Sequence, residues 1–372
     1  MASKSGTPAT VRDMPVPLPV NLHEYEPLAK AAISETAWDY LAGGSGDERT
    51  LRWNRERLDA TRLSPRVLRD VSAVDTRLTL LGAELRFPVL LAPTGFQRLF
   101  HPDGELATAR GAAAAGALWV LSTAATTSME DTAQAALGAR WFQLYVQRDR
   151  GFTRELVRRA EGCGCLALVL TADTPVLGAR DREQRRALEL PAGLELANLR
   201  GVPARVPGGP TFVHGAQNPF LDPSLTWDIL PWLASETRLP VVVKGILRAD
   251  DARLAVERGA AAIAVSNHGG RNLDTVPATI DALPAIAEAV RGRVPLLFDG
   301  GVRRGVDVVK ALALGAQAVM IGRPYLWGLG AAGSEGVERV VRLLVSELEM
   351  AMAQCGAASL SEITRDLVLP AP

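Results

Sequence analysis

The sequence lacks several features that would mark particular classes of protein. Its Lys and Arg residues number 41, as do its Asp and Glu residues, so the formal net charge is zero, and no basic tail or stripe stands out. Proteins that bind nucleic acids or membrane surfaces ordinarily carry such a basic patch. No apolar run approaches the about 20 residues that a membrane-spanning helix requires. We therefore expect neither a nucleic-acid partner nor a membrane.

Cysteine and histidine are also scarce. The three cysteines, Cys163, Cys165 and Cys355, are too few for a disulfide framework and fit a reducing compartment. Cys163 and Cys165 have the wrong spacing for zinc ligands, and the four histidines form no HExxH motif. Residues 1–20 are rich in proline and lack the apolar core of a secretory signal, so we predict a disordered lead-in. We expect a cytoplasmic protein without a metal site.

Short apolar segments recur along the rest of the chain. The eight segments are Phe87–Ala92, Ala117–Ser122, Trp141–Val146, Leu166–Thr171, Leu239–Lys244, Ala261–Ser266, Pro295–Phe298 and Ala318–Ile321. They lack polar alternation, which is typical of strands in a parallel sheet covered on both faces. Helix signals separate them, such as the acidic starts at Asp251 and Asp307. This alternation predicts an α/β fold, a (β/α)8 TIM barrel, with a doubly wound open sheet as the alternative.

Two segments lie outside this repeat. Residues 21–85 precede the first strand and are predicted to cap one end of the barrel. Their predicted helices are Glu24–Ile33, Ala37–Leu41 and Arg49–Leu58. Residues 181–228 separate the fourth strand from its helix and are rich in Pro, Gly and Arg, as in an active-site lid or a disordered segment. Because barrels of this size are common, residues 21–372 are predicted to form a single domain.

Polar side chains follow the predicted strands at their carboxyl ends, where the active sites of such barrels lie. These side chains are Tyr145, Asp173, Lys244, His268, Arg271, Asp299, Arg303 and Arg323. A buried charge costs free energy unless it is paired or used, so this concentration indicates a functional site. His268, next to Arg271, is predicted to be an acid/base group rather than a metal ligand. Lys244, at the end of an apolar strand, would stabilise negative charge.

Glycines and arginines follow the seventh and eighth strands. Gly300 and Gly301 allow the backbone to approach a ligand closely, while Arg303 and Arg323 supply positive charge. The loops after these two strands are the usual phosphate site of this fold, although turn glycines and solvated arginines would give the same pattern. The sequence has no Walker A motif, and no G-x-G-x-x-G motif follows an early strand. We expect phosphate binding, but no P-loop or Rossmann-type nucleotide site.

The longest motifs resemble those of the FMN-dependent 2-hydroxy acid oxidases and dehydrogenases, a family that includes glycolate oxidase, lactate oxidase and the mandelate enzymes. The resemblance rests on SNHGGRNLD at 266–274, FDGGVRRGVDVVKALALGA at 298–316 and IGRP at 321–324. The segments NLHEYEPLAK, YLAGGSGDERTL, APTGFQRLFHPDGELATARGA, WFQLYV, LTADTP and VVVKGIL extend it, in order, over nearly the whole chain after residue 20. It implies a barrel that binds FMN and oxidises a 2-hydroxy acid to a 2-keto acid.

The resemblance also implies roles for individual residues. His268 takes a proton, Asp173 stabilises the imidazolium that forms, and Tyr145 bonds the substrate hydroxyl. The substrate carboxylate is held by Arg180, Arg271 and Tyr25. FMN is bound by Pro93, Thr94, Gly95, Ser122, Gln143, Thr171, Lys244, Ser266, Asp299, Gly301, Arg303, Gly322 and Arg323. The proton that His268 takes is either the α-proton or the hydroxyl proton, and the sequence leaves this choice open.

Two positions depart from relatives. Asn272 stands where many of them have Gln, and Ala124 stands where glycolate oxidase has Trp. The small Ala124 leaves room beside the flavin unless other side chains fill it, and FQRLFHPDGE at 96–105 is more similar to the 4-hydroxymandelate oxidases than to glycolate oxidase. We expect a homotetramer that oxidises an aryl 2-hydroxy acid, such as mandelate or 4-hydroxymandelate, with O2. The alternatives are a lactate or glycolate oxidase, dehydrogenase or monooxygenase, a different FMN barrel, and a non-catalytic anion-binding barrel.

Overall fold

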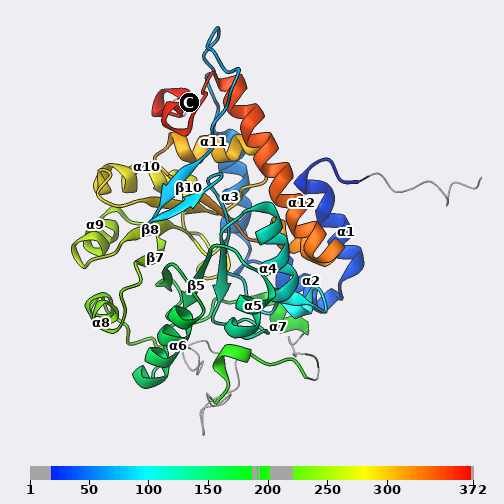
Figure 1. The fold of residues 1–372 in the computed structure, drawn as a ribbon, viewed down its shortest axis with the longest axis vertical. Helices are drawn as coiled ribbons and strands as arrows, with labels where there is room; N and C mark the ends of the chain where they lie inside the picture. The colour runs from blue at the N-terminus through cyan, green and yellow to red at the C-terminus, as the bar shows by residue number, and fades with distance from the viewer. Residues whose placement is uncertain (1–17, 187–190, 192, 202–220, 370–372) are drawn as a thin grey trace, which may run out of the picture.

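Residues 18–186, 191, 193–201 and 221–369 are described by a computed structural model of the chain. At its centre, parallel strands form a closed barrel in the order β10-β3-β4-β5-β6-β7-β8-β9 (Figure 1). The strands are β3 (Val89–Leu91), β4 (Trp119–Ser122), β5 (Arg140–Leu144), β6 (Leu168–Thr171), β7 (Val241–Ile246), β8 (Ala262–Val265), β9 (Leu296–Asp299) and β10 (Ala318–Ile321). The predicted (β/α)8 barrel is confirmed, and the open-sheet alternative is wrong because β10 pairs with β3.

Helices surround the barrel and connect its strands (Figure 1). They are α4 (Gly104–Ala115), α5 (Met129–Ala135), α6 (Arg150–Gly162), α7 (Asp181–Arg186), α8 (Ile229–Glu236), α9 (Ala249–Glu257), α10 (Thr279–Val290), α11 (Gly305–Ala313) and α12 (Arg323–Cys355). Short 3-10 turns lie at Leu22–Glu24, Gln97–Leu99, Ala197–Leu199, Leu360–Glu362 and Arg365–Leu367. The long α12, orange in Figure 1, bends where the backbone of Ala332 and Gly333 leaves the helical region, and it packs against α4.

Three further helices precede the barrel, close to their predicted positions. They are α1 (Tyr25–Ala32), α2 (Glu35–Ala42) and α3 (Arg49–Ala60). Ser34 begins α2 by accepting a hydrogen bond from the backbone N–H of Ala37 at 3.2 Å, as an N-cap residue does. Helix α1 packs on α12, and α3 packs on α10, so these helices flank the barrel. The end of α2 reaches the carboxyl rim of the barrel, where its carbonyls meet functional side chains.

The amino-terminal mouth of the barrel is closed by a hairpin that the sequence analysis missed. Strands β1 (Leu78–Leu80) and β2 (Ala83–Leu85), light blue in Figure 1, pair in antiparallel fashion. The turn between them has positive φ at both Leu81 and Gly82, the geometry of tight hairpin turns. Leu80 is fully buried and shares a core with Leu118 and Ala167, which precede barrel strands. The hairpin lies within residues 21–85, which were predicted to cap one end of the barrel through helices.

The inside of the barrel is filled by side chains. Along β8, Ala262 and Ala264 belong to the core inside the barrel, whereas Ile263 and Val265 belong to the core beneath the helices. The fully buried Trp141 lies in the same inner core as these alanines, so large and small side chains fill the space together. Because the interior is packed and the amino-terminal mouth is closed, the carboxyl rim is the place for a site.

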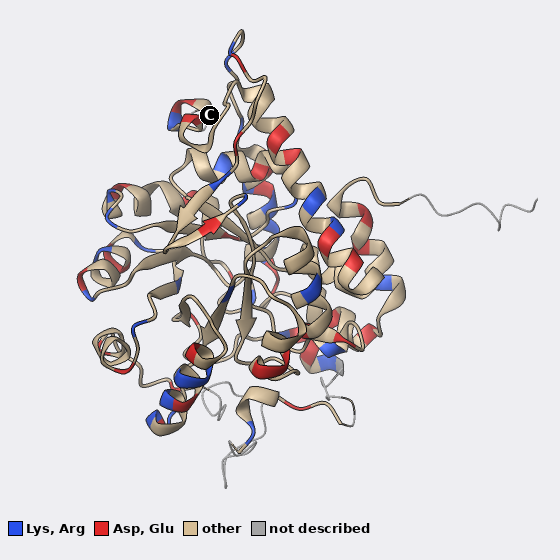
Figure 2. Cartoon of the chain, viewed as in Figure 1, with Lys and Arg blue, Asp and Glu red and all other residues tan. Residues whose placement is uncertain are grey.

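Two sequence predictions concern regions that are largely outside the described residues. Residues 1–17 of the predicted lead-in are among them, as are residues 187–190, 192 and 202–220 of the predicted lid. Within the described part, α7 begins directly after Arg180. No helix in that part is long and apolar enough to cross a membrane. Figure 2 shows basic and acidic residues interspersed over the outer helices that face the viewer.

Candidate active site

The predicted functional side chains meet at the carboxyl rim of the barrel. Ser122, Thr171 and Asp299 are the last residues of β4, β6 and β9. Because the strands are parallel, their carboxyl ends lie at one rim, so side chains from distant parts of the sequence are brought together. Pro93, Thr94 and Gly95 follow β3, Tyr145 follows β5, Ser266 follows β8, and Gly322 follows β10 at the same rim.

Strand β7 continues beyond Lys244, which was predicted to be its last residue. The strand extends to Ile246, and its register against β8 shifts between Lys244 and Ile246. The residue at the shift is Gly245, with φ +111°, and a Cβ atom there would lie 2.4 Å from the Cβ of Asp173. Only glycine allows Asp173 to pack this closely on β7. The sequence analysis missed Gly245 because one glycine near a strand end carries no distinctive signal.

His268 is paired with Asp173. The Nδ1 atom of His268 lies 3.0 Å from Oδ1 of Asp173. Burial lowers the pKa of the His268 imidazole below its ordinary value and the charge of Lys244 adds to this, although Asp173 acts in the opposite direction. Burial alone would raise the pKa of Asp173, but the charge and hydrogen bond of His268 bring it below its ordinary value. The pair therefore has a carboxylate that accepts from Nδ1–H, and the Nε2 atom is left with a free lone pair.

The loop that carries His268 is held on several sides. His268 itself has φ +57°, and its backbone N–H donates to Ser266 Oγ at 3.1 Å. The neighbouring Asn267 exchanges two side-chain hydrogen bonds, of 2.9 and 2.7 Å, with Asn54 of α3. Both amides are buried, so the exchange satisfies groups that would otherwise be costly. Asn54 is a positioning residue that the sequence analysis did not identify, since a lone Asn within a helix gives no signal.

Lys244 is buried between two polar partners. Its Nζ donates to Ser266 Oγ at 2.8 Å and lies 3.3 Å from Oδ2 of Asp299, while the residue is 4% exposed. The second carboxylate oxygen of Asp299, Oδ1, is buried without a hydrogen-bond partner among the described residues. An unpaired buried oxygen of this kind calls for a donor from a ligand, such as a hydroxyl group.

A row of polar side chains crosses three neighbouring strands. Ser122 Oγ donates to Gln143 Oε1 at 3.0 Å, and Gln143 Nε2 donates to Thr171 Oγ1 at 2.9 Å. All three residues are buried. At the end of β3, the Thr94 side chain is hydrogen-bonded to the hydroxyl of Tyr325, which donates to the carbonyl of Ala92 at 2.9 Å. The row supplies both donors and acceptors beneath the rim, as a flat heteroaromatic ligand with polar edges requires.

Arg303 and Arg323 form a cationic corner after β9 and β10. Burial, together with the charges of Arg271 and Arg303, lowers the pKa of Arg323 to about 9, and burial lowers that of Arg303 to about 10. Within the described part of the chain, neither guanidinium forms an ion pair with a carboxylate; Arg303 lies over the Trp327 ring at 4.6 Å. A phosphate would relieve both shifts, because it stabilises the charged form.

Space for an anion is available beside this corner. A Cβ atom on Gly322 would meet only Cγ2 of Thr94, at 3.9 Å. Gly301 has φ +89°, and a Cβ atom there would lie 2.5 Å from the carbonyl oxygen of Asn54. Glycine is therefore required at 301 and leaves open space at 322. The cationic corner, the buried Lys244 and the unpaired Asp299 oxygen together fit a phosphate-bearing flavin such as FMN.

Arg180 and Arg271 meet around one carboxylate. Glu183 of α7 lies 2.9 Å from Nη2 of Arg271 and 3.5 Å from Nη1 of Arg180. Arg180 also donates through Nε to the carbonyl of Arg271 at 3.2 Å. Arg271 donates from Nη1 to the carbonyls of Tyr40 and Gly43, at 2.7 and 2.9 Å. Glu183 was not identified from the sequence, because an acidic residue in an Arg-rich segment is ordinary.

The tyrosine that contacts this arginine pair is Tyr40, whereas the sequence analysis had named Tyr25. The guanidinium of Arg271 lies over the Tyr40 ring at 4.7 Å. Arg271 and Arg180 both act on the Tyr40 hydroxyl, although burial is the largest cause of its raised pKa. Tyr25 is buried at the start of α1, where burial raises its pKa and the acting charge is that of Arg339. Both tyrosines come from the same cap segment, and no sequence pattern distinguishes them.

Tyr145 lies close enough to Asp173 for the carboxylate to act on its hydroxyl. Burial and the charge of Asp173 raise the pKa of its hydroxyl, so it stays protonated at neutral pH and is able to donate a hydrogen bond. Its backbone N–H donates to Thr123 Oγ1 at 3.1 Å. A protonated phenol near a neutral imidazole and two guanidinium groups suits a substrate with a hydroxyl and a carboxylate.

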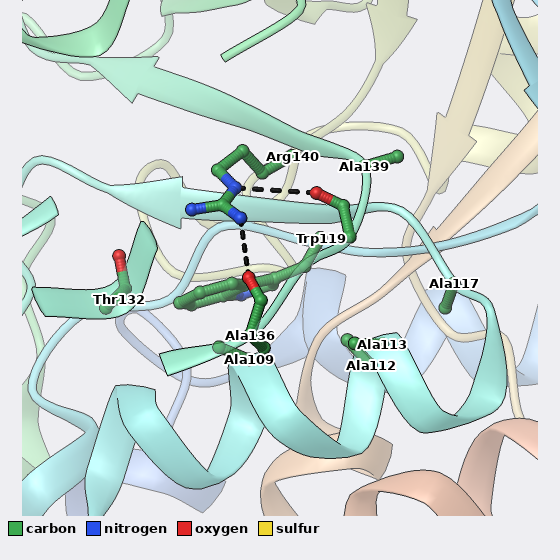
Figure 3. A pocket seen from close by; sticks show the side chains of 10 residues that line it. Ala109, Ala112, Ala113, Ala117, Trp119, Thr132, Ala136, Ala139 and Arg140 are labelled. Atoms are coloured by element: carbon green, nitrogen blue, oxygen red, sulfur yellow. Dashed lines mark hydrogen bonds between the residues drawn. The ribbon is translucent and has the colours of Figure 1, made fainter. Parts of the chain in front are cut away.

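Outside the rim, the hollows among the described residues are lined by none of the predicted site residues. A small hollow lined by alanines, Trp119 and Arg140 lies between α4 and the outer side of β4 and β5 (Figure 3). Arg140 there donates to the carbonyl of Ala136 at 2.7 Å, and the hollow contains none of the predicted site residues. No group of three or more His, Cys, Asp and Glu side chains in the described part is placed to hold a metal ion.

Comparison with known proteins agrees with this geometry. The family model described as FMN-dependent dehydrogenase matches residues 29–370. An L-lactate oxidase from Nostoc sp. is 51% identical over 93% of this chain and 96% of its own length. A peroxisomal (S)-2-hydroxy-acid oxidase from Oryza sativa subsp. japonica is 49% identical over 95% of this chain and 96% of its own. A structure of mandelate oxidase with (S)-4-hydroxymandelic acid has a TM-score of 0.88 at 42% identity, covering 94% of this chain and 98% of that one.

The family model covers most of the chain, and it is the family whose cofactor fits the cationic corner, Lys244 and Asp299. The chain belongs to the FMN-dependent dehydrogenase family, and it is an enzyme that uses FMN.

Proposed function

We propose that the enzyme oxidises an aryl 2-hydroxy acid, such as mandelate or 4-hydroxymandelate, to the 2-keto acid and reduces O2 to H2O2. The observation that carries the proposal is the position of a neutral base, His268 held by Asp173 at 3.0 Å, at the same rim as the Arg180–Arg271 pair. A 2-hydroxy acid presents the two groups that this rim is suited to bind: a carboxylate, and a hydroxyl on the adjacent carbon.

The proton leaves the substrate to Nε2 of His268, from carbon or from the hydroxyl. Asp173 accepts from Nδ1 and stabilises the imidazolium that forms, so His268 is a stronger base than it would be without this carboxylate. Tyr145 donates to the substrate hydroxyl and holds it in place. FMN, when bound, supplies the acceptor for the two electrons that leave the same carbon.

Arg271 retains donors for the substrate carboxylate. A guanidinium has five N–H groups. Three of those of Arg271 are used by the carbonyls of Tyr40 and Gly43 and by Glu183. Of the other two, one faces the hydroxyl of Tyr40, and Arg180 is joined to Arg271 through the Arg271 carbonyl. A planar carboxylate suits such a fork, since two parallel N–H donors match its two oxygens.

The preference for an aryl substrate rests on the side of the rim after β3 and β4. Ala124 lies beside Gly95, where a Cβ atom would be 3.0 Å from that of Ala124, so two small residues adjoin there. Phe96 donates through its backbone N–H to the carbonyl of Ala124 at 3.1 Å, and its ring meets that of Tyr40 edge-on at 5.4 Å. A small, half-buried side chain next to aromatic rings suits a phenyl group. The mandelate oxidase structures, one with (S)-mandelic acid, support the same choice.

Oxidation of L-lactate is the second candidate. The relative described as an L-lactate oxidase is 51% identical, above the 42% of the mandelate oxidase structure with (S)-4-hydroxymandelic acid. A small substrate would also fit a rim in which Ala124 leaves room. Both candidates share the base, the arginine pair and FMN, so they differ only in what occupies the space beside Ala124.

The experiment is a comparison of kcat/KM for mandelate, 4-hydroxymandelate, L-lactate and glycolate under air. We expect the aryl acids to give the highest values, with one H2O2 formed per keto acid. A preference for glycolate or lactate would overturn the aryl assignment, and flavin that stays reduced in air would overturn O2 as the acceptor. His268→Gln provides the control: it should keep its yellow flavin and lose about 100- to 10,000-fold in turnover.

A further inference from the structure

Asn272 contacts both residues of the Asp173–Thr174 pair. Its Nδ2 donates to the backbone carbonyl of Asp173 at 2.8 Å and to Thr174 Oγ1 at 2.8 Å. A carbonyl oxygen accepts and never donates, so the amide nitrogen, rather than its oxygen, must face Asp173. The orientation of the Asn272 side chain is therefore fixed by its surroundings.

This orientation decides the direction of the next hydrogen bonds. Because Thr174 Oγ1 accepts from Asn272, its own hydrogen is free to be donated elsewhere. Three groups are within reach: Oδ1 of Asp173 at 3.2 Å, Nδ1 of His268 at 3.4 Å, and the hydroxyl of Tyr145. Nδ1 already donates its hydrogen to Asp173, and a charged carboxylate is a stronger acceptor than the Tyr145 hydroxyl, so Thr174 donates to Asp173. Asn272 therefore donates to Thr174, and Thr174 donates to Asp173, which also accepts from Nδ1 of His268.

We propose that Asn272 is a positioning residue for the catalytic base, which it holds in its working tautomer through the hydroxyl of Thr174 and the carboxylate of Asp173. The amide occupies one of the two acceptor positions of the Thr174 hydroxyl and so favours the rotamer in which its hydrogen points to Asp173. Thr174 in turn takes up part of the negative charge of Asp173. The proposal rests on the proposed role of His268 as the base.

A shift in the titration of His268 is the consequence. The charged groups that act on His268 are Asp173, which favours the imidazolium, and Lys244 and Arg180, which oppose it. Removal of the Thr174 hydroxyl leaves more negative charge on Asp173 and changes neither cation. The pKa of His268 should then rise, by about 0.5 to 1 unit for the loss of one hydrogen bond to a charged group.

The test is the pKa of His268 by NMR in protein with 15N-labelled histidine and bound FMN, where the chain has only four histidines. Thr174→Val removes the hydroxyl at nearly constant volume and should raise this pKa, whereas Thr174→Ser keeps the hydroxyl and should leave it near the wild-type value. His268→Gln assigns the signal. Equal pKa values in the Val and Ser variants would overturn the proposal.

The part played by Asn272 is tested by a double-mutant cycle. Asn272→Leu should raise the pKa of His268 in the same direction as Thr174→Val, and the double variant should shift it no further than Thr174→Val alone, because both act through one hydroxyl. Additive shifts, or no shift in Asn272→Leu, would overturn the proposal. The visible spectrum and melting temperature of each variant report folding.

The acid limb of kcat/KM should move with the same pKa. If none of the four hydroxy acids is oxidised, the proposed function fails, while the NMR titration still decides the role of Asn272. If turnover is normal and the titration is unchanged in every variant, this inference fails and the proposed function stands.

Discussion

Arg271 and Arg323 donate hydrogen bonds to the same atom, the carbonyl oxygen of Gly43, at 2.9 and 2.8 Å. Gly43 is the C-cap of α2, and the adjacent carbonyls of Tyr40 and Leu41 each accept from one of the two arginines. The last carbonyls of a helix carry partial negative charge and lack partners within the helix. The end of α2 thus acts as a carboxylate would, between Arg271 of the Arg180–Arg271 pair and Arg323 of the cationic corner.

The two arginines should nevertheless have separable effects. Arg323→Met should weaken FMN binding by about 10- to 100-fold, since it removes a charged donor from the cationic corner. Arg271→Met should lower kcat/KM by a similar factor, mainly through KM, because it removes donors from the substrate carboxylate. FMN affinity is measured by fluorescence quenching on the apoprotein, and kcat/KM at saturating FMN.

Each variant is the control for the other, because both lose a guanidinium that bonds Gly43. Normal FMN affinity in Arg323→Met would contradict the binding of the FMN phosphate at the cationic corner. Equal loss of FMN in both variants would mean that the end of α2, rather than either arginine, is what both substitutions disturb.

The pH dependence of kcat/KM should follow His268. The active form has a neutral imidazole, so kcat/KM should fall about tenfold per pH unit below the pKa of this group. Burial lowers that pKa from 6.5, and the acid limb is therefore expected below pH 6.5. Asp173→Asn removes the one charge that raises it, so the limb should move to still lower pH while the maximal rate falls. A limb above pH 7 in the wild type would contradict the assignment.

The sequence predicted the elements of this site better than their contacts. The strands of the barrel and the groups at their ends follow from apolar runs and from what stands after them, as with Asp299 and Arg323. Gly43 acts through a backbone carbonyl, which every residue has, so no pattern marks it. Tyr40 and Tyr25 both lie in the cap, and only packing shows which one meets Arg271. The hairpin β1–β2 has strands of three residues, too short for a periodic signal.

Ala124→Trp should change substrate preference. An indole at this half-buried position would fill the rim where the phenyl group is proposed to bind, so kcat/KM for mandelate should fall at least 100-fold, while the value for glycolate should change less than tenfold. The comparison is made with both substrates on the same enzyme preparation. Ala124→Ser, which adds one oxygen atom, is the matched control and should retain the aryl preference. A loss of both activities in proportion would contradict a steric role for Ala124.

Gly245→Ala should impair catalysis by His268 indirectly, by displacing Asp173. The backbone there has φ +111°, which costs a non-glycine residue about 1 to 3 kcal/mol, and the new Cβ would lie 2.4 Å from that of Asp173. Either β7 or Asp173 must move, so kcat/KM should fall at least tenfold and the melting temperature should fall as well. Gly292→Ala is the control: it has φ +70° with nothing within 4 Å of the added Cβ, and it bears the backbone cost alone. If the two variants lose the same stability and Gly245→Ala keeps full activity, then the close approach of β7 does not position Asp173, and the His268–Asp173 distance must be set by the loops that carry these residues.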